Sequence, residues 1–142
     1  MSDILHQITI NAPKDKVYAA LSTVDGLAGW WTSTTKGEGA PGKTLEFRFG
    51  DSVTKMRVEE LDEGNHVAWL VTDSVQAWLG TRVTFDLTED RGRTKVLFGH
   101  RAWKETGPFL AHCSMQWATF LLSLRDFGET GHGRPFPSHL RV

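Results

Sequence analysis

The stretch from Thr106 to Thr130 constrains the fold of this chain more than any other. It reads TGPFLAHCSMQWATFLLSLRDFGET. Its apolar residues recur at steps of three and four, the pattern of one helical face. These residues are Leu110, Cys113, Trp117, Phe120, Leu121, Leu124 and Phe127. A long amphipathic helix gains most of its stability by packing such a face. The rest of the chain must therefore supply an apolar surface that holds this helix.

The residues at both ends of the stretch predict where the helix begins and ends. Thr106 is expected to cap the N-terminus, and Pro108 suits the first turn, where a missing N–H costs nothing. Gly128 and Gly131 favour termination, with Pro135 beyond them. About 22 helical residues would span roughly 33 Å, the width of a small domain.

Ahead of this helix, the sequence predicts one strand, two short helices and five further strands. The first strand is expected from Ile4 to Asn11, and the helices from Pro13 to about Ser22 and from Val24 to Trp31. The later strands alternate in polarity and cover 43–50, 53–61, 66–72, 81–88 and 94–103. Residues 32–43 are rich in glycine and small polar residues and predict a loop, whereas 73–80 fit either a strand or a covering loop.

This order of elements predicts an α+β fold in a single domain spanning residues 1–142. Consecutive strands with tight turns imply an antiparallel sheet, and an apolar face on that sheet must be covered. A twisted sheet of about six strands would curve around the long C-terminal helix, leaving a space between them. On the last strand, Phe98, His100 and Ala102 are expected to face inward, and Arg101 and Trp103 outward.

Composition excludes several classes of function. The net charge is −1 with both signs mixed along the chain, which argues against binding nucleic acid. No apolar run reaches the roughly 20 residues of a membrane span, and the N-terminus lacks a signal-peptide pattern, so a cytoplasmic protein is expected. Cys113 is the only cysteine, and the six histidines show no zinc-binding spacing. No metal and no cofactor are predicted.

Three local motifs resemble one known superfamily. INAPxxxVYxxL at residues 10–21, GWW at 29–31 and GxxGxGxP at 128–135 occur in an order similar to that of START-like proteins. They most resemble the branch named after the activator of the heat-shock-protein-90 ATPase. The resemblance implies a helix-grip fold with an internal cavity, and the superfamily includes polyketide cyclases and lipid-transfer domains. The larger eukaryotic activators carry an extra chaperone-binding domain for which this chain has no room, so a chaperone partner is not expected.

A large set of aromatic and apolar side chains is expected to face the space between sheet and helix. It comprises Trp30, Trp31, Phe47, Phe49, Met56, Trp69, Phe85, Phe98, Trp117 and Phe120. These residues could line an apolar ligand pocket, or they could form a packed core without a ligand.

Three polar residues are candidates for the same region. His100 lies on an apolar strand face, where it could act as an acid–base or ligand-orienting group, or as a core histidine bonded to a backbone carbonyl. His112 and Gln116 lie one turn apart near the helix start. They could point into the cavity mouth, or they could form a solvated helix edge.

Three hypotheses on function follow from these patterns. The first is a protein that binds a hydrophobic small molecule between sheet and helix. The second is a cyclase- or hydrolase-type enzyme that uses the same cavity, with His100 as acid or base. The third is a protein-interaction module related to chaperone ATPase activators. A homodimer is compatible with all three.

Overall fold

The computed structural model describes residues 1–142, and its central element is one antiparallel sheet of seven strands. The strand order is β1-β7-β6-β5-β4-β3-β2, so the first strand pairs with the last and the others follow in sequence. The strands are β1 (Ser2–Ile10), β2 (Thr35–Gly37), β3 (Thr44–Phe49), β4 (Ser52–Asp62), β5 (His66–Asp73), β6 (Arg82–Asp90) and β7 (Arg93–Trp103). Their inward residues alternate with exposed ones, which explains why this sequence pairs as strands.

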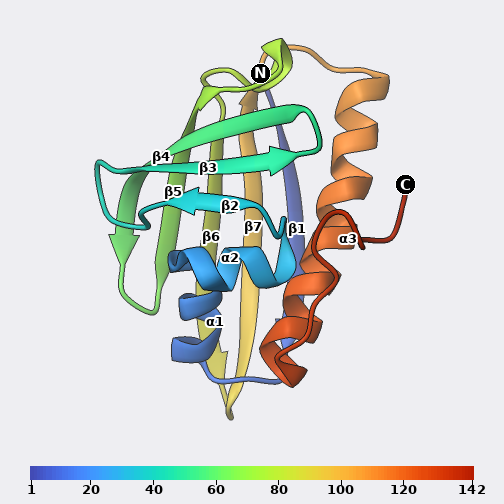
Figure 1. Ribbon diagram of the computed structural model, residues 1–142. Coiled ribbons are helices and arrows are strands. Elements are labelled where there is room, and N and C mark those ends of the chain that lie inside the picture. Colours follow the sequence, from blue (N-terminus) through green and yellow to red (C-terminus); the bar gives the residue numbers. More distant parts are fainter.

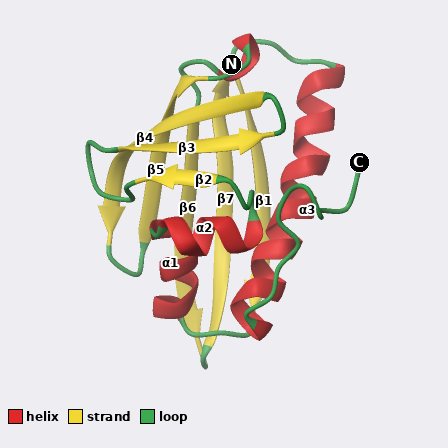
Figure 2. Cartoon of the chain, viewed as in Figure 1, coloured by secondary structure: helices red, strands yellow, loops and turns green.

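Three helices lie on one face of this curved sheet (Figure 1). They are α1 (Lys14–Ser22), α2 (Val24–Trp30) and α3 (Pro108–Thr130). The long α3 runs beside β1, where His6 Nε2 lies 3.0 Å from the carbonyl oxygen of Ser114 (Figure 2). The predicted α+β fold, with a curved antiparallel sheet, two short helices after the first strand and a long C-terminal helix, is confirmed. None of the helices combines the length and the apolar character that crossing a membrane requires.

The sheet has one strand more than the six expected. The additional strand, β2, lies inside the segment predicted as a loop, and Thr35 pairs there with Phe47 of β3. It covers only three residues at the sheet edge, in a stretch rich in glycine, so its sequence shows no alternation.

The two ends of α3 differ from the predicted ones. Thr106 does not cap the helix; the capping position is Gly107, with φ of 152° and no side-chain hydrogen bond. At the other end the helix continues through Gly128, because a Cβ there would come within 3.0 Å of Ile10 and glycine permits this close approach. It ends at Gly131, whose φ of 83° is left-handed and whose N–H bonds the carbonyl of Phe127.

The prediction that Trp103 faces outward is wrong. Ser2 pairs with Trp103 and Ile4 with His100, so that two residues of β7 stand opposite Asp3 alone. At this β-bulge Ala102 adopts a positive φ of 71° and donates its N–H to Asp3 Oδ1 over 3.0 Å. The extra residue reverses the alternation, and Trp103 is fully buried.

Candidate functional site

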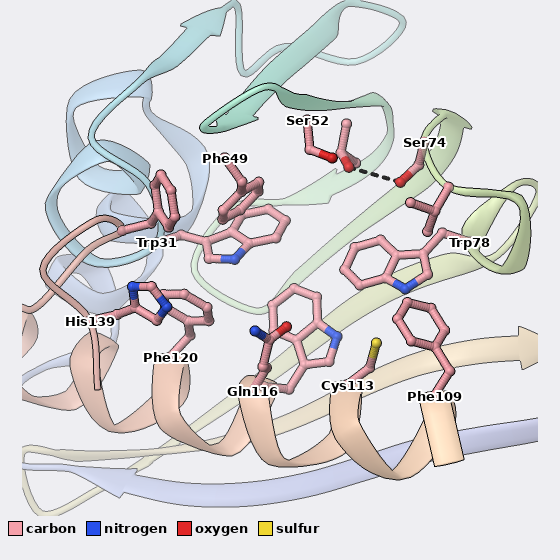
Figure 3. A pocket seen from close by; sticks show the side chains of 14 residues that line it. Trp31, Phe49, Ser52, Ser74, Trp78, Phe109, Cys113, Gln116, Phe120 and His139 are labelled. Atoms are coloured by element: carbon pink, nitrogen blue, oxygen red, sulfur yellow. Dashed lines mark hydrogen bonds between the residues drawn. The ribbon is translucent and has the colours of Figure 1, made fainter. Parts of the chain in front are cut away.

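A cavity of about 210 Å³ lies between the N-terminal half of α3 and the sheet (Figure 3). One wall comes from α3, whose turns direct a set of side chains to the same side. These are Phe109, Cys113, Gln116, Trp117 and Phe120. Nine of the 14 residues that line the cavity are hydrophobic, which makes the cavity apolar in character.

The opposite wall comes from α2 and the β3–β4 hairpin. Trp31 ends α2, and its ring lies 4.3 Å from that of Phe47 and 4.9 Å from that of Trp117, between ring centroids. Phe49 ends β3, and Thr54 follows on β4 after the tight turn. These contacts fix the Trp31 indole against the cavity.

Two irregular segments complete the cavity. The loop after β5 contains the short 3₁₀ helix η1 (Gln76–Trp78), and the Trp78 ring stacks on Trp117 with centroids 5.9 Å apart. This loop is joined to β4 by a 2.8 Å hydrogen bond between Ser74 Oγ and Thr54 Oγ1. It answers the ambiguity at residues 73–80 in favour of a loop that covers something.

The C-terminal tail forms the last part of the wall. The N–H of Phe136 donates to the carbonyl oxygen of Trp31 over 2.8 Å, which anchors the tail beside α2. His139 then stacks on Phe120, with ring centroids 5.1 Å apart. Sequence reasoning missed the tail because it has no periodicity; its only signal was the pair of aromatic rings in an otherwise polar segment.

The cavity wall carries no charged side chain. The residues that line it include no Asp, Glu, Lys or Arg. Burial raises the pKa of the Cys113 thiol, and the indole of Trp78 beside the sulfur acts in the opposite direction. The cavity is therefore suited to uncharged molecules, since an ion would lose its hydration there without a counter-charge.

His100 faces inward, as predicted, but lies behind the cavity wall. It is fully buried, and Trp117 Nε1–H donates to its Nδ1 over 3.0 Å. An indole nitrogen can only donate, so Nδ1 accepts and the proton sits on Nε2. Nε2–H then donates to Thr81 Oγ1 over 2.8 Å, and the Thr81 hydroxyl donates to the carbonyl of Trp78.

This network keeps His100 neutral. Burial lowers the pKa of His100 to about 3. Its partners are two side chains, rather than the backbone carbonyl expected for a core histidine. Because His100 does not line the cavity and both ring nitrogens are engaged, it positions Trp117 and the loop beside Trp78.

The structure divides the predicted site residues into three groups. The cavity wall contains Trp31, Phe49, Gln116, Trp117 and Phe120. The core behind it contains Trp30, Phe47, Met56, Trp69, Phe85, Phe98 and His100, all fully buried.

His112 belongs to neither group, and the prediction that it points into the cavity mouth is wrong. It is exposed on α3 and lies beside the ring of Phe109. Four residues complete slightly more than one helical turn, so the step from Gln116 back to His112 moves the side chain toward solvent.

Residues 11–129 match the family described as "Activator of Hsp90 ATPase homolog 1-like protein". The chain belongs to this family. The START-like resemblance of the motifs at both ends of the sequence is thereby confirmed. No protein with a curated description matches the chain.

Solved structures agree with membership of the Hsp90 ATPase activator-like family. The Aha1 dimer from Colwellia psychrerythraea is 41% identical, with a TM-score of 0.86 over 94% of this chain and 100% of that one. A Staphylococcus saprophyticus protein is 19% identical, with a TM-score of 0.78 over 93% of this chain and 95% of its own. A Bacillus halodurans protein is 20% identical, with a TM-score of 0.76 over 91% and 98%. The last two share the fold alone.

Proposed function

We propose that this protein binds a small hydrophobic molecule in the cavity between α3 and the sheet. The observation that carries this proposal is the cavity of about 210 Å³ with a mostly apolar wall. An apolar cavity of about 150 Å³ in another protein takes up benzene. By that comparison, the cavity suits a molecule of one or two rings and is too small for a sterol.

The position of the histidines favours binding over catalysis. A cyclase- or hydrolase-type reaction needs an acid or base within hydrogen-bond reach of the substrate. His100 lies behind Trp117 with both nitrogens bonded, and the imidazole on the cavity wall is that of His139. We therefore rank a binding protein ahead of an enzyme that uses His100.

Filling the cavity tests this proposal. Gln116→Trp adds an indole to the cavity wall, whereas the control His112→Trp adds the same group one turn earlier, on the exposed side of α3. Binding of tetralin, a neutral bicyclic hydrocarbon, is measured by calorimetry and by the melting temperature. At about 100 times its dissociation constant, a ligand stabilises the folded state by roughly 2.7 kcal/mol.

We expect tetralin to bind the wild type and His112→Trp alike and to lose affinity for Gln116→Trp. Equal affinity for both variants would place the binding site elsewhere. No binding to the wild type by tetralin or by any other one- or two-ring compound would contradict the proposal and leave the interaction module ahead.

The exposed face of α3 supports a second proposal, a homodimer. Met115 and Leu122 lie seven residues apart on one face and are 57% and 41% exposed, and Leu140 of the tail, 53% exposed, lines a groove together with Leu122. Such exposed apolar side chains favour a protein contact. The structure from Colwellia psychrerythraea is described as a dimer, which favours a second copy as the partner.

Light scattering coupled to size-exclusion chromatography tests the homodimer. Met115→Lys should dissociate it, whereas Leu5→Lys, at a residue 53% exposed on β1, should leave it intact. A wild type that is monomeric at all concentrations would refute this second proposal.

A further inference from the structure

Trp31 presents an unpaired hydrogen-bond donor to the cavity. Its side chain is only 2% exposed, and its indole nitrogen makes no hydrogen bond within the chain. Figure 3 shows this nitrogen pointing into the cavity, across from the amide of Gln116. An indole nitrogen donates and cannot accept, so only an acceptor can satisfy it. Since buried donors are nearly always paired, the missing partner is an acceptor that enters the cavity.

The neighbouring indoles do not share this property. Trp30 donates to the carbonyl oxygen of Ala20 over 2.8 Å, and Trp117 donates to His100. The indole nitrogen of Trp78 is buried without a partner, but it lies beside the sulfur of Cys113 and is closed off from the cavity (Figure 3). Trp31 is thus the tryptophan whose N–H a ligand can reach.

The rest of the wall determines the charge of that ligand. No Asp, Glu, Lys or Arg lines the cavity, so a carboxylate or an ammonium group would be desolvated without an opposite charge. The aromatic rings of Trp31, Trp117 and Phe120 provide flat apolar contact instead.

We infer that the ligand is a neutral aromatic molecule of one or two rings whose oxygen accepts a hydrogen bond from Trp31 Nε1–H. This inference rests on the binding function proposed above and names the class of ligand and the residue that orients it. The amide of Gln116 faces the same space and can donate a second hydrogen bond to the same oxygen.

The experiment compares two probes of nearly equal size, 1-tetralone and tetralin, which differ by one carbonyl oxygen. Affinities are measured by calorimetry for the wild type, Trp31→Phe and the control Trp30→Phe. Both substitutions remove one indole from a buried site of α2 and its cap, but only Trp31 faces the cavity. The ratio of the two affinities cancels any change in cavity volume.

We expect the preference for 1-tetralone over tetralin to fall about fivefold in Trp31→Phe, the effect of one neutral hydrogen bond, and to stay unchanged in Trp30→Phe. The anion 1-naphthoate should bind the wild type at least about tenfold more weakly than 1-tetralone, because the cavity offers no counter-charge. Tighter binding of 1-naphthoate would overturn the neutral class.

A second readout does not depend on the variants. In a ¹H–¹⁵N spectrum of the wild type, 1-tetralone should shift the Trp31 indole resonance downfield and tetralin should not. If both probes bind, but the Trp31→Phe ratio or, should that variant not fold, the indole shift shows no difference between them, the inference is wrong and the binding function stands. If neither probe binds, the binding function fails and the inference with it.

Discussion

His100 orders the aromatic residues around it through hydrogen bonds that only one tautomer allows. Trp117 donates to Nδ1, and Nε2 donates to Thr81, whose hydroxyl bonds the carbonyl of Trp78. The sequence placed His100 on the inward face correctly because strand alternation still holds at that position. Its partners lie on other elements, 17 and 19 residues away, so the sequence left its role open.

The low pKa of His100 predicts a pH-dependent stability. Burial lowers the pKa in the folded state to about 3, from 6.5 in a solvated histidine, so the unfolded chain binds a proton that the folded chain does not. Stability is full above pH 6.5 and falls as the pH drops toward 3. From pH 7 to pH 5 the free energy of unfolding should lose about 2 kcal/mol through this residue.

Urea unfolding at pH 5 and pH 7 measures this effect, with His100→Gln as the comparison. Glutamine does not titrate, so the variant should lose about 2 kcal/mol less than the wild type between the two pH values. An identical pH dependence for both proteins would show that His100 is protonated in the folded state or accessible to water.

At the level of the elements, the β-bulge in β7 decides which residues complete the core. Ala102 takes a left-handed φ of 71° at the bulge, and Trp103 is buried as a result. Sequence alternation could not reveal it, because the left-handed position holds an alanine where glycine would have signalled a bulge. The edge strand β2 escaped for a similar reason, being too short to show a pattern. Long, periodic elements such as α3 and β6 were predicted closely.

Ala102→Gly should stabilise the protein. An L-residue in the left-handed region costs roughly 1–2 kcal/mol, which glycine avoids, although glycine loses part of this through the greater freedom of the unfolded chain. We expect a net gain of about 1 kcal/mol in chemical unfolding. The control Ala111→Gly, in the exposed part of α3, should lose about 1 kcal/mol. A loss at both positions would contradict the bulge geometry.

Trp117→Ala tests the packing of α3 against the sheet. The side chain is 2% exposed and contacts Trp31, Phe98 and Trp78. Its removal enlarges the cavity and leaves His100 Nδ1 without its donor, so unfolding should require roughly 3–5 kcal/mol less free energy. A thermal melt that matches the wild type would mean that this face of α3 does not pack on the sheet.

At the scale of the whole molecule, the cavity is a product of four chain segments that meet only after folding. α2, the β3–β4 hairpin, the loop around η1 and the C-terminal tail all close on α3 (Figure 1). The sequence predicted a space between sheet and helix and named part of its wall. It could not predict that most of the aromatic set would fill the core, or that irregular segments would supply Ser74, Trp78, Phe136 and His139.

Intermolecular nuclear Overhauser effects between bound 1-tetralone and the isotope-labelled protein test the central claim most directly. They report which side chains lie within a few ångströms of the ligand. The account predicts contacts from the ligand's aromatic protons to Trp31, Trp117 and Phe120, which line the cavity, and none to His112, which lies on the exposed side of α3. Contacts confined to Met115 and Leu122 on the outer face of α3, or none at saturating ligand, would contradict it.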